Sequence, residues 1–568
     1  MNILGIWDGH DAGAALLVDG TLVSAVNEER LTRRKLEIGF PTRSIEACLA
    51  SANLGPERID AVAASTADVA KTIGRLAPWT RERYYLVRRR KARPGVISTL
   101  TRDAKYALTT WPPNRMTRAW SRSLLQGTLR RAGLTRAAVH VFDHHDCHAI
   151  AAACASGFDA CAVVTIDGVG DGLSATTSTF QGGRLTRVSA TPATHSLGVF
   201  FEHVTTLLNM RELEDEGKVM ALADYAPAVS DADNPLLDLL RVEDGRIVMA
   251  RTGASLRRRL AALHWRVPNE QFARMAQRAV EKTTVALVQD AVARTGQRRV
   301  AVAGGVASNI KATRQARLLD AVDSLYVFPH MGDGGLALGA ALSMAGRAGA
   351  APRLELDSLA IGPAYPEDRM AAALAARGLS PSRAEVTEAA ADLLERGAVV
   401  MWFQGGMEYG PRALGHRSVL ARADRPQLRD RLNLVLKRRV WYQPFCPSML
   451  VSEARRVLED WDDAPPLNRH MTMAHTVKPG CRADLGAVIG IDGTCRPQLV
   501  DDEADGPFAA LLRAIRRRTG RGILLNTSFN IHGEPLVCTP EDAVDVYLRA
   551  GADALALGPF LVTSRAGE

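Results

Sequence analysis

Residues 2–30 read NILGIWDGHDAGAALLVDGTLVSAVNEER, and this stretch indicates how the N-terminal half of the chain folds. Runs rich in β-forming residues at 3–6, 14–18 and 22–26 predict three short strands. The dipeptide Asp19-Gly20, between the second and third runs, strongly favours a tight β-hairpin. The stretch therefore predicts a three-stranded meander that contains an acid-glycine turn.

A similar unit recurs at residues 160–188, ACAVVTIDGVGDGLSATTSTFQGGRLTRV. Here a strand ends at Asp167, glycines follow, and Gly182-Gly183 separates two further strands. Alternating strands and helices surround the two meanders, which predicts a duplicated α/β domain whose mixed sheet is covered by helices. The other expected elements are helices near 117–131 and 269–294, a strand at 139–142, and strand–glycine turn–helix units at 298–319 and 325–346.

The chain of 568 residues is longer than one hydrophobic core usually organises, so we expect two domains. Its 47% apolar and 23% charged residues are ordinary for a globular protein and exclude a disordered one. Proline and glycine without periodicity in APRLELDSLAIGPAYP predict a linker at 351–366. The expected domains are therefore 1–350 and 367–568, and the second is long enough for another α/β fold.

The N-terminus lacks a basic segment followed by an apolar one, and no apolar run reaches about 18 residues. The eight cysteines contain no CxxC pair, so neither a disulfide framework nor a zinc ribbon is predicted. We therefore expect a cytoplasmic protein without a membrane span.

The net charge of +9 comes from one region. Residues 71–136, here called the basic insertion, hold 17 basic and two acidic residues, so the remainder of the chain is net acidic. The insertion includes VRRRKARPG at 87–95 and is typical of a surface that meets phosphates or another anionic partner. The interpretation that we favour is a solvated helical insertion whose arginine stems cover apolar neighbours. Its aromatic residues are Trp79, Tyr84, Tyr85, Trp111 and Trp120.

The stretch FDHHDCHA, residues 142–149, is dense in groups that bind metal ions. If Asp143 caps a helix here, His144 and His148 stand four residues apart on one helical face and can share an ion. His145 then points elsewhere. Histidine pairs with this spacing also occur as surface or core groups, so the spacing alone does not establish a metal site.

Two aspartates strengthen the prediction of a metal site. Asp167 and Asp333 each follow an apolar strand and lie among glycines, a place well suited to a metal-phosphate assembly. Two imidazoles and two carboxylates suit Fe(II), Mn(II) or Zn(II) better than calcium, which prefers an all-oxygen shell. The alternative is that these aspartates only form turns.

Two glycine-containing stretches are candidates for phosphate contacts. In VAGGVASN (302–309) and EDEGKVMALA (214–223), glycine turns let backbone amides approach phosphate oxygens, and Lys218 adds a charge. Together with the two acid-glycine hairpins, they match the way actin-like and sugar-kinase-like ATPases hold nucleotide phosphates. We therefore expect ATP to bind the first domain.

In the second domain, basic residues lie among glycine, proline and apolar residues. Guanidinium groups in such surroundings usually recognise carboxylate or phosphate, with salt bridges between loops as the alternative. These residues are Arg412, Arg417, Lys437, Arg439 and Arg496.

Ten motifs occur in the order found in NodU/CmcH-type O-carbamoyltransferases, and the resemblance covers essentially the whole chain. They are HDAGAALLVDG with NEERLTRRK, HHDCH, TIDGVGDG, GKVMALA, AGGVASN, GDGGLALGAA, GPRALGHRS, PFCPSML, DGTCRPQ and LNTSFNIHGEP. The resemblance implies an actin-like N-terminal domain and a YrdC-like C-terminal domain. The second would make carbamoyl-adenylate from carbamoyl phosphate and ATP, and the first would transfer the carbamoyl group to an acceptor hydroxyl.

The resemblance also implies roles for individual residues. His10 would remove the acceptor's proton, and His144, His148, Asp167 and Asp333 would hold a divalent metal, with Fe(II) favoured over Mn(II) or Zn(II). Contacts to ATP or the adenylate in the first domain would come from Lys35, Gly168, Gly170, Lys218, Gly304, Gly305 and Asn309. Contacts to carbamoyl phosphate and ATP in the second would come from Arg412, Arg417, Lys437, Arg439, Arg496, Asn526, Ser528 and Asn530.

The chain departs from the family pattern at two places. Gln443 replaces an arginine expected to contact carbamoyl phosphate, so either Arg438 or Arg439 compensates or donor binding is weakened. Ala221 stands where the family has glycine, which puts the local turn in doubt but not Lys218.

Two other functions compete with the transfer of carbamoyl groups to a small molecule. A tRNA threonylcarbamoylation-type enzyme would use the basic insertion directly, but the ordered motifs match the small-molecule branch. A nucleotide-gated actin-like chaperone or regulator would need neither HHDCH nor the anion-binding residues of the second domain. We expect a small-molecule hydroxyl acceptor from antibiotic or other secondary metabolism, not a nucleic acid. The aromatic residues of the insertion suggest a neutral or apolar acceptor near His10.

Overall fold

The structure is a computed structural model that describes residues 1–93, 98–350, 353–383, 385–463 and 468–563, and the side chains of 98–103 lie outside this description. The chain forms two compact units. Unit 1 comprises Met1–Glu28 and Glu37–Glu355, and unit 2 comprises Glu29–Leu36 and Leu356–Glu568. The boundary after Glu355 falls within 351–366, where the sequence predicts a linker; residues 351 and 352 lie outside the described ones.

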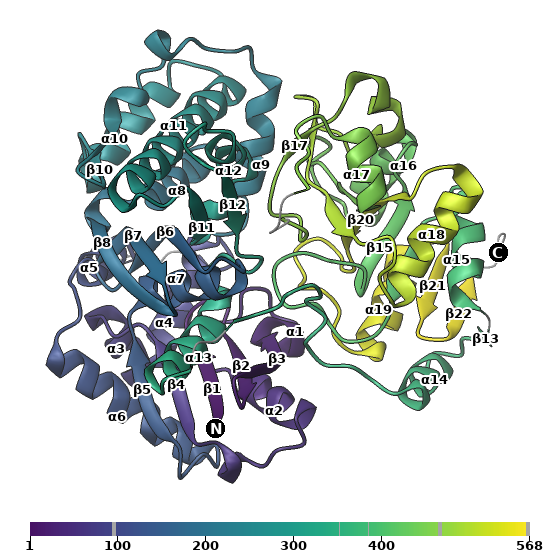
Figure 1. Ribbon diagram of the computed structural model, residues 1–568, viewed down its shortest axis with the longest axis horizontal. Helices are drawn as coiled ribbons and strands as arrows, with labels where there is room; N and C mark the ends of the chain where they lie inside the picture. The colour runs from purple at the N-terminus through teal and green to yellow at the C-terminus, as the bar shows by residue number, and fades with distance from the viewer. Residues whose placement is uncertain (94–97, 351–352, 384, 464–467, 564–568) are drawn as a thin grey trace. The chain divides into compact units, whose positions relative to one another are not determined.

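The first meander of unit 1 forms the predicted strands and continues into a five-stranded sheet with the order β3-β2-β1-β4-β5 (Figure 1). Neighbours in the meander are antiparallel, whereas β1, β4 and β5 are parallel. Asp19 adopts a positive φ of 49° at the hairpin, as its acid-glycine turn requires. The strands are β1 (Asn2–Trp7), β2 (Gly13–Val18), β3 (Thr21–Asn27), β4 (Ala61–Ser65) and β5 (Ala138–Phe142).

The second meander repeats this topology. Its sheet has the order β12-β11-β6-β7-β8, with antiparallel pairs within the meander and β6, β11 and β12 parallel. The two sheets therefore share strand order and strand direction, which confirms the predicted duplicated α/β fold. The strands are β6 (Ala160–Gly170), β7 (Leu173–Gln181), β8 (Arg184–Pro192), β11 (Arg299–Ala303) and β12 (Ser324–Val327).

Two helices, α7 (His144–Ala155) and α13 (Leu336–Arg347), pack against each other, and each covers one sheet (Figure 1). α13 contacts β1 and β4, and α7 contacts β6 and β11. The close approach requires Gly339, because a Cβ there would overlap the carbonyl oxygen of Cys147. As a result, the start of α7 lies beside the short 3₁₀ turn Asp333–Gly335 that precedes α13.

The basic insertion forms helices and contributes no strand to the sheets among its described residues. α3 packs against the other three helices, and the predicted helix near 117–131 is observed as α6. Asn114 caps α6 by accepting from the amides of Met116 and Thr117. The helices are α3 (Val69–Leu76), α4 (Pro78–Arg88), α5 (Ser98–Thr109) and α6 (Arg115–Arg131).

The remaining elements of unit 1 surround the two sheets. The long helix predicted at 269–294 is observed as α11 and ends at Gly296, whose φ of 67° is typical of a helix C-terminus. The helices are α2 (Thr42–Ser51), α8 (Leu197–Leu207), α9 (Glu216–Leu222), α10 (Gly253–His264), α11 (Asn269–Thr295) and α12 (Ile310–Arg317), and β9 (Leu240–Glu243) pairs with β10 (Arg246–Met249).

Unit 2 is also α/β and contains an eight-stranded mixed sheet that is buried on both faces. Alternate residues of one central strand contribute to two separate cores, with Met401 and Phe403 in one and Val400 and Trp402 in the other. In sheet order the strands are β13 (Ser382–Arg383), β22 (Phe560–Thr563), β21 (Ala554–Leu557), β14 (Val400–Phe403), β15 (Arg417–Arg422), β20 (Ile523–Ser528), β16 (Cys446–Leu450) and β19 (Gln498–Val500).

Helices cover this sheet, and a short π-helix at Leu432–Leu436 leads into Lys437. π-helical turns are rare and often occur at functional sites. The helices are α14 (Glu367–Ala375), α15 (Val386–Glu395), α16 (Pro426–Arg431), α17 (Val451–Val457), α18 (Pro507–Thr519) and α19 (Pro540–Ala550), and β17 (His475–Thr476) pairs with β18 (Thr494–Cys495). The likeness of unit 2 to YrdC stays a prediction.

Residues 29–36, which include most of helix α1 (Glu28–Thr32), group with unit 2 although both flanking segments belong to unit 1. Arg30 donates to the carbonyl of Gly410 at 2.9 Å, and Arg33 donates to the carbonyl of Leu536. Leu31 packs against the apolar side chains around Leu536. The chain therefore passes between the two units three times.

Among the described residues, no helix combines the length and the apolar character that a membrane crossing requires.

Candidate functional site

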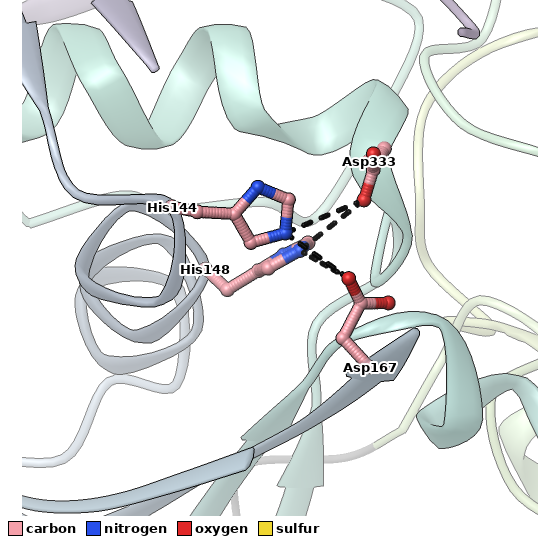
Figure 2. A group of neighbouring side chains, drawn as sticks. All are labelled: His144, His148, Asp167 and Asp333. Carbon is pink, nitrogen blue, oxygen red and sulfur yellow. Dashed lines mark hydrogen bonds and ion pairs between the residues drawn. The ribbon is translucent and has the colours of Figure 1, made fainter. Parts of the chain in front are cut away.

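Four side chains of unit 1 converge as the sequence predicts (Figure 2). His144 and His148 come from α7, Asp167 from the end of β6, and Asp333 from the turn before α13. One ligand atom from each lies within 4.8 Å of the other three. Three of the four residues are buried, and Asp333 is nearly so. The arrangement is a closed group of two imidazoles and two carboxylates.

The surroundings fix the direction of each ligand. Asp143 caps α7 by accepting from the amide of Asp146, as predicted. Thr66 Oγ1 lies 3.0 Å from His144 Nδ1, which turns Nε2 of the same ring toward Asp167. The amide of Gly305 donates to Asp167 Oδ1 at 2.7 Å and leaves Oδ2 facing the histidines. Such contacts behind the ligands hold them in place for an ion.

The distances and charges within the group fit a shared metal ion. His148 Nε2 is buried and has no hydrogen-bond partner among the described residues, although it lies 3.8 Å from Asp167 Oδ2 and 3.6 Å from Asp333 Oδ1. Ligands about 2.1 Å from one ion lie roughly 3 to 3.5 Å from each other. Burial opposes a charged imidazole, yet the carboxylates of Asp333 and Asp167 raise the pKa of His144 to about 9. The site therefore favours positive charge.

Gly170 leaves space for one of these ligands, because a Cβ at this position would overlap the His144 ring. We expect Gly170→Ala to displace the imidazole and lower the metal content of the purified protein at least about tenfold, while the secondary structure is kept. Elemental analysis with circular dichroism measures both. Gly346→Ala, on α13 with open space at its Cβ, is the matched control. Equal metal content in both variants would argue against His144 as a ligand.

His10 lies at the edge of the same group. Its Nδ1 is 3.5 Å from Asp333 Oδ2, and its ring centroid is 5.0 Å from that of Tyr85. Burial lowers the pKa of His10, and the carboxylate of Asp333 only partly opposes this shift. A neutral imidazole at this place can accept a proton. His145 points elsewhere, as predicted, with Nδ1 2.8 Å from Thr165 Oγ1.

The sequence analysis missed a buried ionic group two residues before His10. Asp8 pairs with Lys71 Nζ at 2.8 Å and with two nitrogens of Arg75 at 2.9 and 3.0 Å. These bonds anchor the basic insertion beside the site. The duplicated fold could have revealed Asp8, because Asp8-Gly9 follows β1 just as Asp167-Gly168 follows the apolar part of β6.

The residues predicted to contact a nucleotide in the first domain differ in how far contacts within the fold already occupy them. Gly304 has a φ of 96° and a Cβ there would overlap the carbonyl of Ile166, so only glycine suits this turn. Lys218 pairs with Asp215 at 2.7 Å in the first turn of α9. The expected turn at 214–223 is largely helix α9, so Ala221 needs no glycine conformation. The side chain of Asn309 caps α12 and bonds with Gln277.

Gly168 and Lys35 complete this predicted set. A Cβ on Gly168 would meet Glu202 Oε1 at an ordinary 3.7 Å, so the position has no steric need for glycine. Lys35 lies in 29–36 and therefore groups with unit 2, not with the first domain in which the sequence places it.

In unit 2, three predicted arginines gather around Cys446; we call Arg412, Arg439 and Arg496 the cationic cluster. Arg496 donates to Cys446 Sγ at 3.0 and 3.2 Å. Burial lowers the pKa of Arg412 to about 9, and the charge of Arg496 adds to that shift. Arg412 Nε and Arg439 Nη2 are buried without hydrogen-bond partners among the described residues. Adjacent cations with unsatisfied donors form a site for an anion.

The polar residues predicted for the same site lie on the neighbouring strand and loop. Lys437 Nζ donates to Asn530 Oδ1 at 2.7 Å and to the carbonyl of Ser528. Burial, followed by the charge of Arg439, holds the pKa of Lys437 well below its usual range. Asn526 donates to Ser448 Oγ at 2.9 Å, and its buried Oδ1 has no partner among the described residues.

The structure distinguishes the two arginines that could compensate for Gln443. Arg439 packs its guanidinium 4.2 Å from the ring centroid of Phe445, whereas Arg438 is exposed. Arg439 is therefore the better substitute for the arginine replaced by Gln443.

Arg417 differs from the other arginines because its terminal nitrogens donate to backbone carbonyls, including those of Gln404 and Gly405. Those bonds hold a loop and leave little of Arg417 for a ligand.

The basic insertion presents less charge than its composition suggests. Arg88 pairs with Glu202 and Glu212, and Arg89 is only 2% exposed and pairs with Glu214. These arginines of the VRRRKARPG stretch are therefore neutralised inside unit 1 and are poorly placed to contact RNA phosphates.

The chain matches a family in both halves. The carbamoyltransferase N-terminus family matches residues 2–342, and the carbamoyltransferase C-terminus family matches residues 391–564. Nodulation protein NolNO of Sinorhizobium fredii is 32% identical over 98% of this chain and 79% of its own length. Nodulation protein NolO of Bradyrhizobium diazoefficiens is 34% identical over 74% of this chain and 79% of its own length.

Among solved structures, HypF of T. kodakarensis matches 61% of this chain and 48% of its own, with 13% identity and a TM-score of 0.33. The family matches together cover most of the chain, in the order that the ten motifs predict. The chain therefore belongs to the carbamoyltransferase family and is an enzyme of the O-carbamoyltransferase type that its sequence predicts.

Proposed function

We propose that this carbamoyltransferase acts in two steps and that ATP drives the first. In unit 2, carbamoyl phosphate gives up phosphate to water, and the resulting carbamate attacks the α-phosphorus of ATP. Pyrophosphate leaves, and carbamoyl-adenylate forms. In unit 1, the hydroxyl of a small molecule attacks the carbamoyl carbon, AMP leaves, and a carbamate ester remains. The acceptor belongs to secondary metabolism.

The cationic cluster is the observation that carries the proposal. A family of carbamoyltransferases needs a carbamoyl donor, and the donor proposed here, carbamoyl phosphate, is a dianionic acyl phosphate. Arg412 and Arg439 supply unsatisfied, buried donors, and Arg496 adds a third guanidinium beside Cys446, so the cluster matches such a group. Lys437 and Ser528 extend the polar surface on the adjoining strand.

For the second step, His144, His148, Asp167 and Asp333 would hold a divalent ion, with Fe(II) favoured and Mn(II) or Zn(II) as alternatives. An ion bound there would polarise the carbamoyl group and stabilise negative charge on its oxygen. His10 takes the proton of the acceptor hydroxyl, because its imidazole is neutral and adjoins the ligand group.

The test of this proposal is a product assay with the full chain. With ATP and carbamoyl phosphate together, we expect release of both phosphate and pyrophosphate and a mass signal for carbamoyl-adenylate. Leaving out carbamoyl phosphate should abolish pyrophosphate release. Cleavage of ATP to ADP and phosphate instead, independent of carbamoyl phosphate, would contradict the proposal and favour a nucleotide-gated regulator.

A further inference from the structure

Two basic side chains inside the basic insertion have no carboxylate partner among the residues that the structure describes. Arg81, on α4, is 6% exposed, and its Nε and Nη1 have no hydrogen-bond partner among the described residues. Lys105, on α5, has a buried Nζ that likewise lacks a partner there. An unpaired charge costs several kcal/mol to bury, so proteins rarely keep one without a ligand to pair it.

The nearby carboxylates do not neutralise these two groups. Asp8 is shared by Lys71 and Arg75, which occupy both of its oxygens. Burial lowers the pKa of Lys105 to about 6, and the charges of Arg88 and Arg81 add to that shift. Arg88 itself is already paired with Glu202 and Glu212. Arg81 and Lys105 therefore remain basic groups without a carboxylate partner in the described interior of the insertion.

Lys105 lies next to the transfer site. Lys105 Nζ is 3.6 Å from the ring centroid of Tyr84 and 4.5 Å from that of Tyr85. The ring of Tyr85 is in turn 5.0 Å from that of His10. One tyrosine ring thus separates the Lys105 amine from the predicted base.

The backbone is shaped to admit the Arg81 side chain. A Cβ on Gly74 of α3 would lie 3.2 Å from Arg81 Cδ and 3.8 Å from its Nε, so the arginine lies close against the helix. By contrast Trp79, Trp111 and Trp120 are 71%, 60% and 58% exposed. Of the aromatic residues of the insertion, Tyr85 packs beside His10 and Tyr84 packs against Tyr85.

We propose that Arg81 and Lys105 form a subsite that binds an oxyanion, a carboxylate or a phosphate, on the acceptor molecule whose hydroxyl reacts beside His10. The fork of Arg81 matches either group, and the tyrosine rings pack against the body of the acceptor. The acceptor is therefore anionic, not neutral or apolar as the aromatic composition suggests. The assignment to the acceptor rests on the proposed function, whereas anion binding itself does not.

The test uses the full chain carrying Arg412→Ala, so that the cationic cluster of unit 2 contributes less. Thermal unfolding is followed against inorganic phosphate in one series and acetate in another, at constant ionic strength. We expect a saturable rise in Tm with at least one of them, because a ligand that binds only the folded state stabilises it. Phosphate alone would indicate a phosphorylated acceptor and acetate alone a carboxylated one; both would indicate a site open to either group.

Variants assign the binding to the subsite. Arg81→Gln and Lys105→Met should each weaken apparent anion affinity about tenfold or more, the effect of losing one hydrogen bond to a charged group. Arg83→Gln, an exposed residue of the same helix, should bind like the parent. Without anion, Lys105→Met should be at least as stable as the parent, since it removes a buried polar group that has no hydrogen-bond partner among the described residues. If Arg81→Gln does not fold, Lys105→Met decides alone.

No saturable rise with either anion, or equal affinity in Lys105→Met and the parent, would overturn the subsite. Pyrophosphate release, measured on the chain without Arg412→Ala, separates the two proposals. If pyrophosphate release is intact but no anion binds at the insertion, only this inference is wrong. Anion binding without release leaves the subsite standing and contradicts the proposed first step.

Discussion

Replacement of His148 by alanine is expected to lower carbamoyl transfer at least about 100-fold. Changes behind a metal ligand already cost 10- to 100-fold in affinity or activity, and His148 is itself one of the four converging side chains. The residues that we propose to form carbamoyl-adenylate belong to unit 2. Carbamoyl-phosphate-dependent pyrophosphate release should therefore stay close to that of the parent. Elemental analysis and the two product assays measure metal, transfer and release.

The matched control is His145→Ala. His145 lies on the same helix and is equally buried, but it bonds Thr165 and is outside the four-residue group. It should keep its metal content even if its Tm falls. A His148→Ala protein that binds metal and carbamoylates acceptor like the parent would show that the assigned site is wrong.

Replacement of Arg412 by alanine should lower pyrophosphate release and leave the metal content unchanged, the opposite of His148→Ala. Removing one buried donor that faces a developing or bound anion typically costs 100- to 1000-fold in rate, so pyrophosphate release should fall by about that factor. Metal content should not change, because the ligands lie in unit 1. Synthetic carbamoyl-adenylate should restore carbamoylated product, since it bypasses the first step.

Arg517→Ala provides the control for charge removal, because Arg517 is 63% exposed and pairs only at the surface with Glu388. It should release pyrophosphate at the parental rate. If added carbamoyl-adenylate fails to restore product in a folded Arg412→Ala protein, the division of the reaction between two sites is not correct.

The fold and the convergence of the four side chains were predictable because each depends on local rules. An apolar run that is followed by Asp-Gly places a carboxylate toward the carboxyl end of a strand, and this happens at Asp167 in β6. Asp143 caps α7 and aligns His144 with His148 by helical spacing. The convergence of the ligands then follows from the duplicated sheets, whose topology the paired meanders predict.

What the sequence did not reveal depends on pairing between distant residues. The composition around Arg88 and Arg89 is compatible with a surface that meets phosphates, but their partners Glu202, Glu212 and Glu214 lie 114 to 125 residues away. Arg417 resembled its neighbours in sequence, yet backbone carbonyls surround it. Burial and long-range ion pairs decide whether an arginine serves a ligand or the fold, and neither can be read from local composition.

The segment 29–36 has a consequence for how the protein is made. These eight residues leave the ribosome about 320 residues before the main part of unit 2, so at about 5–20 residues per second they precede it by roughly 16 to 64 seconds. Unit 2 completes its packing around Leu31 and Arg33 only by recruiting a piece synthesised long before. A gene divided at the boundary after Glu355 would leave that piece on the wrong polypeptide, so the two units have a topological reason to remain one chain.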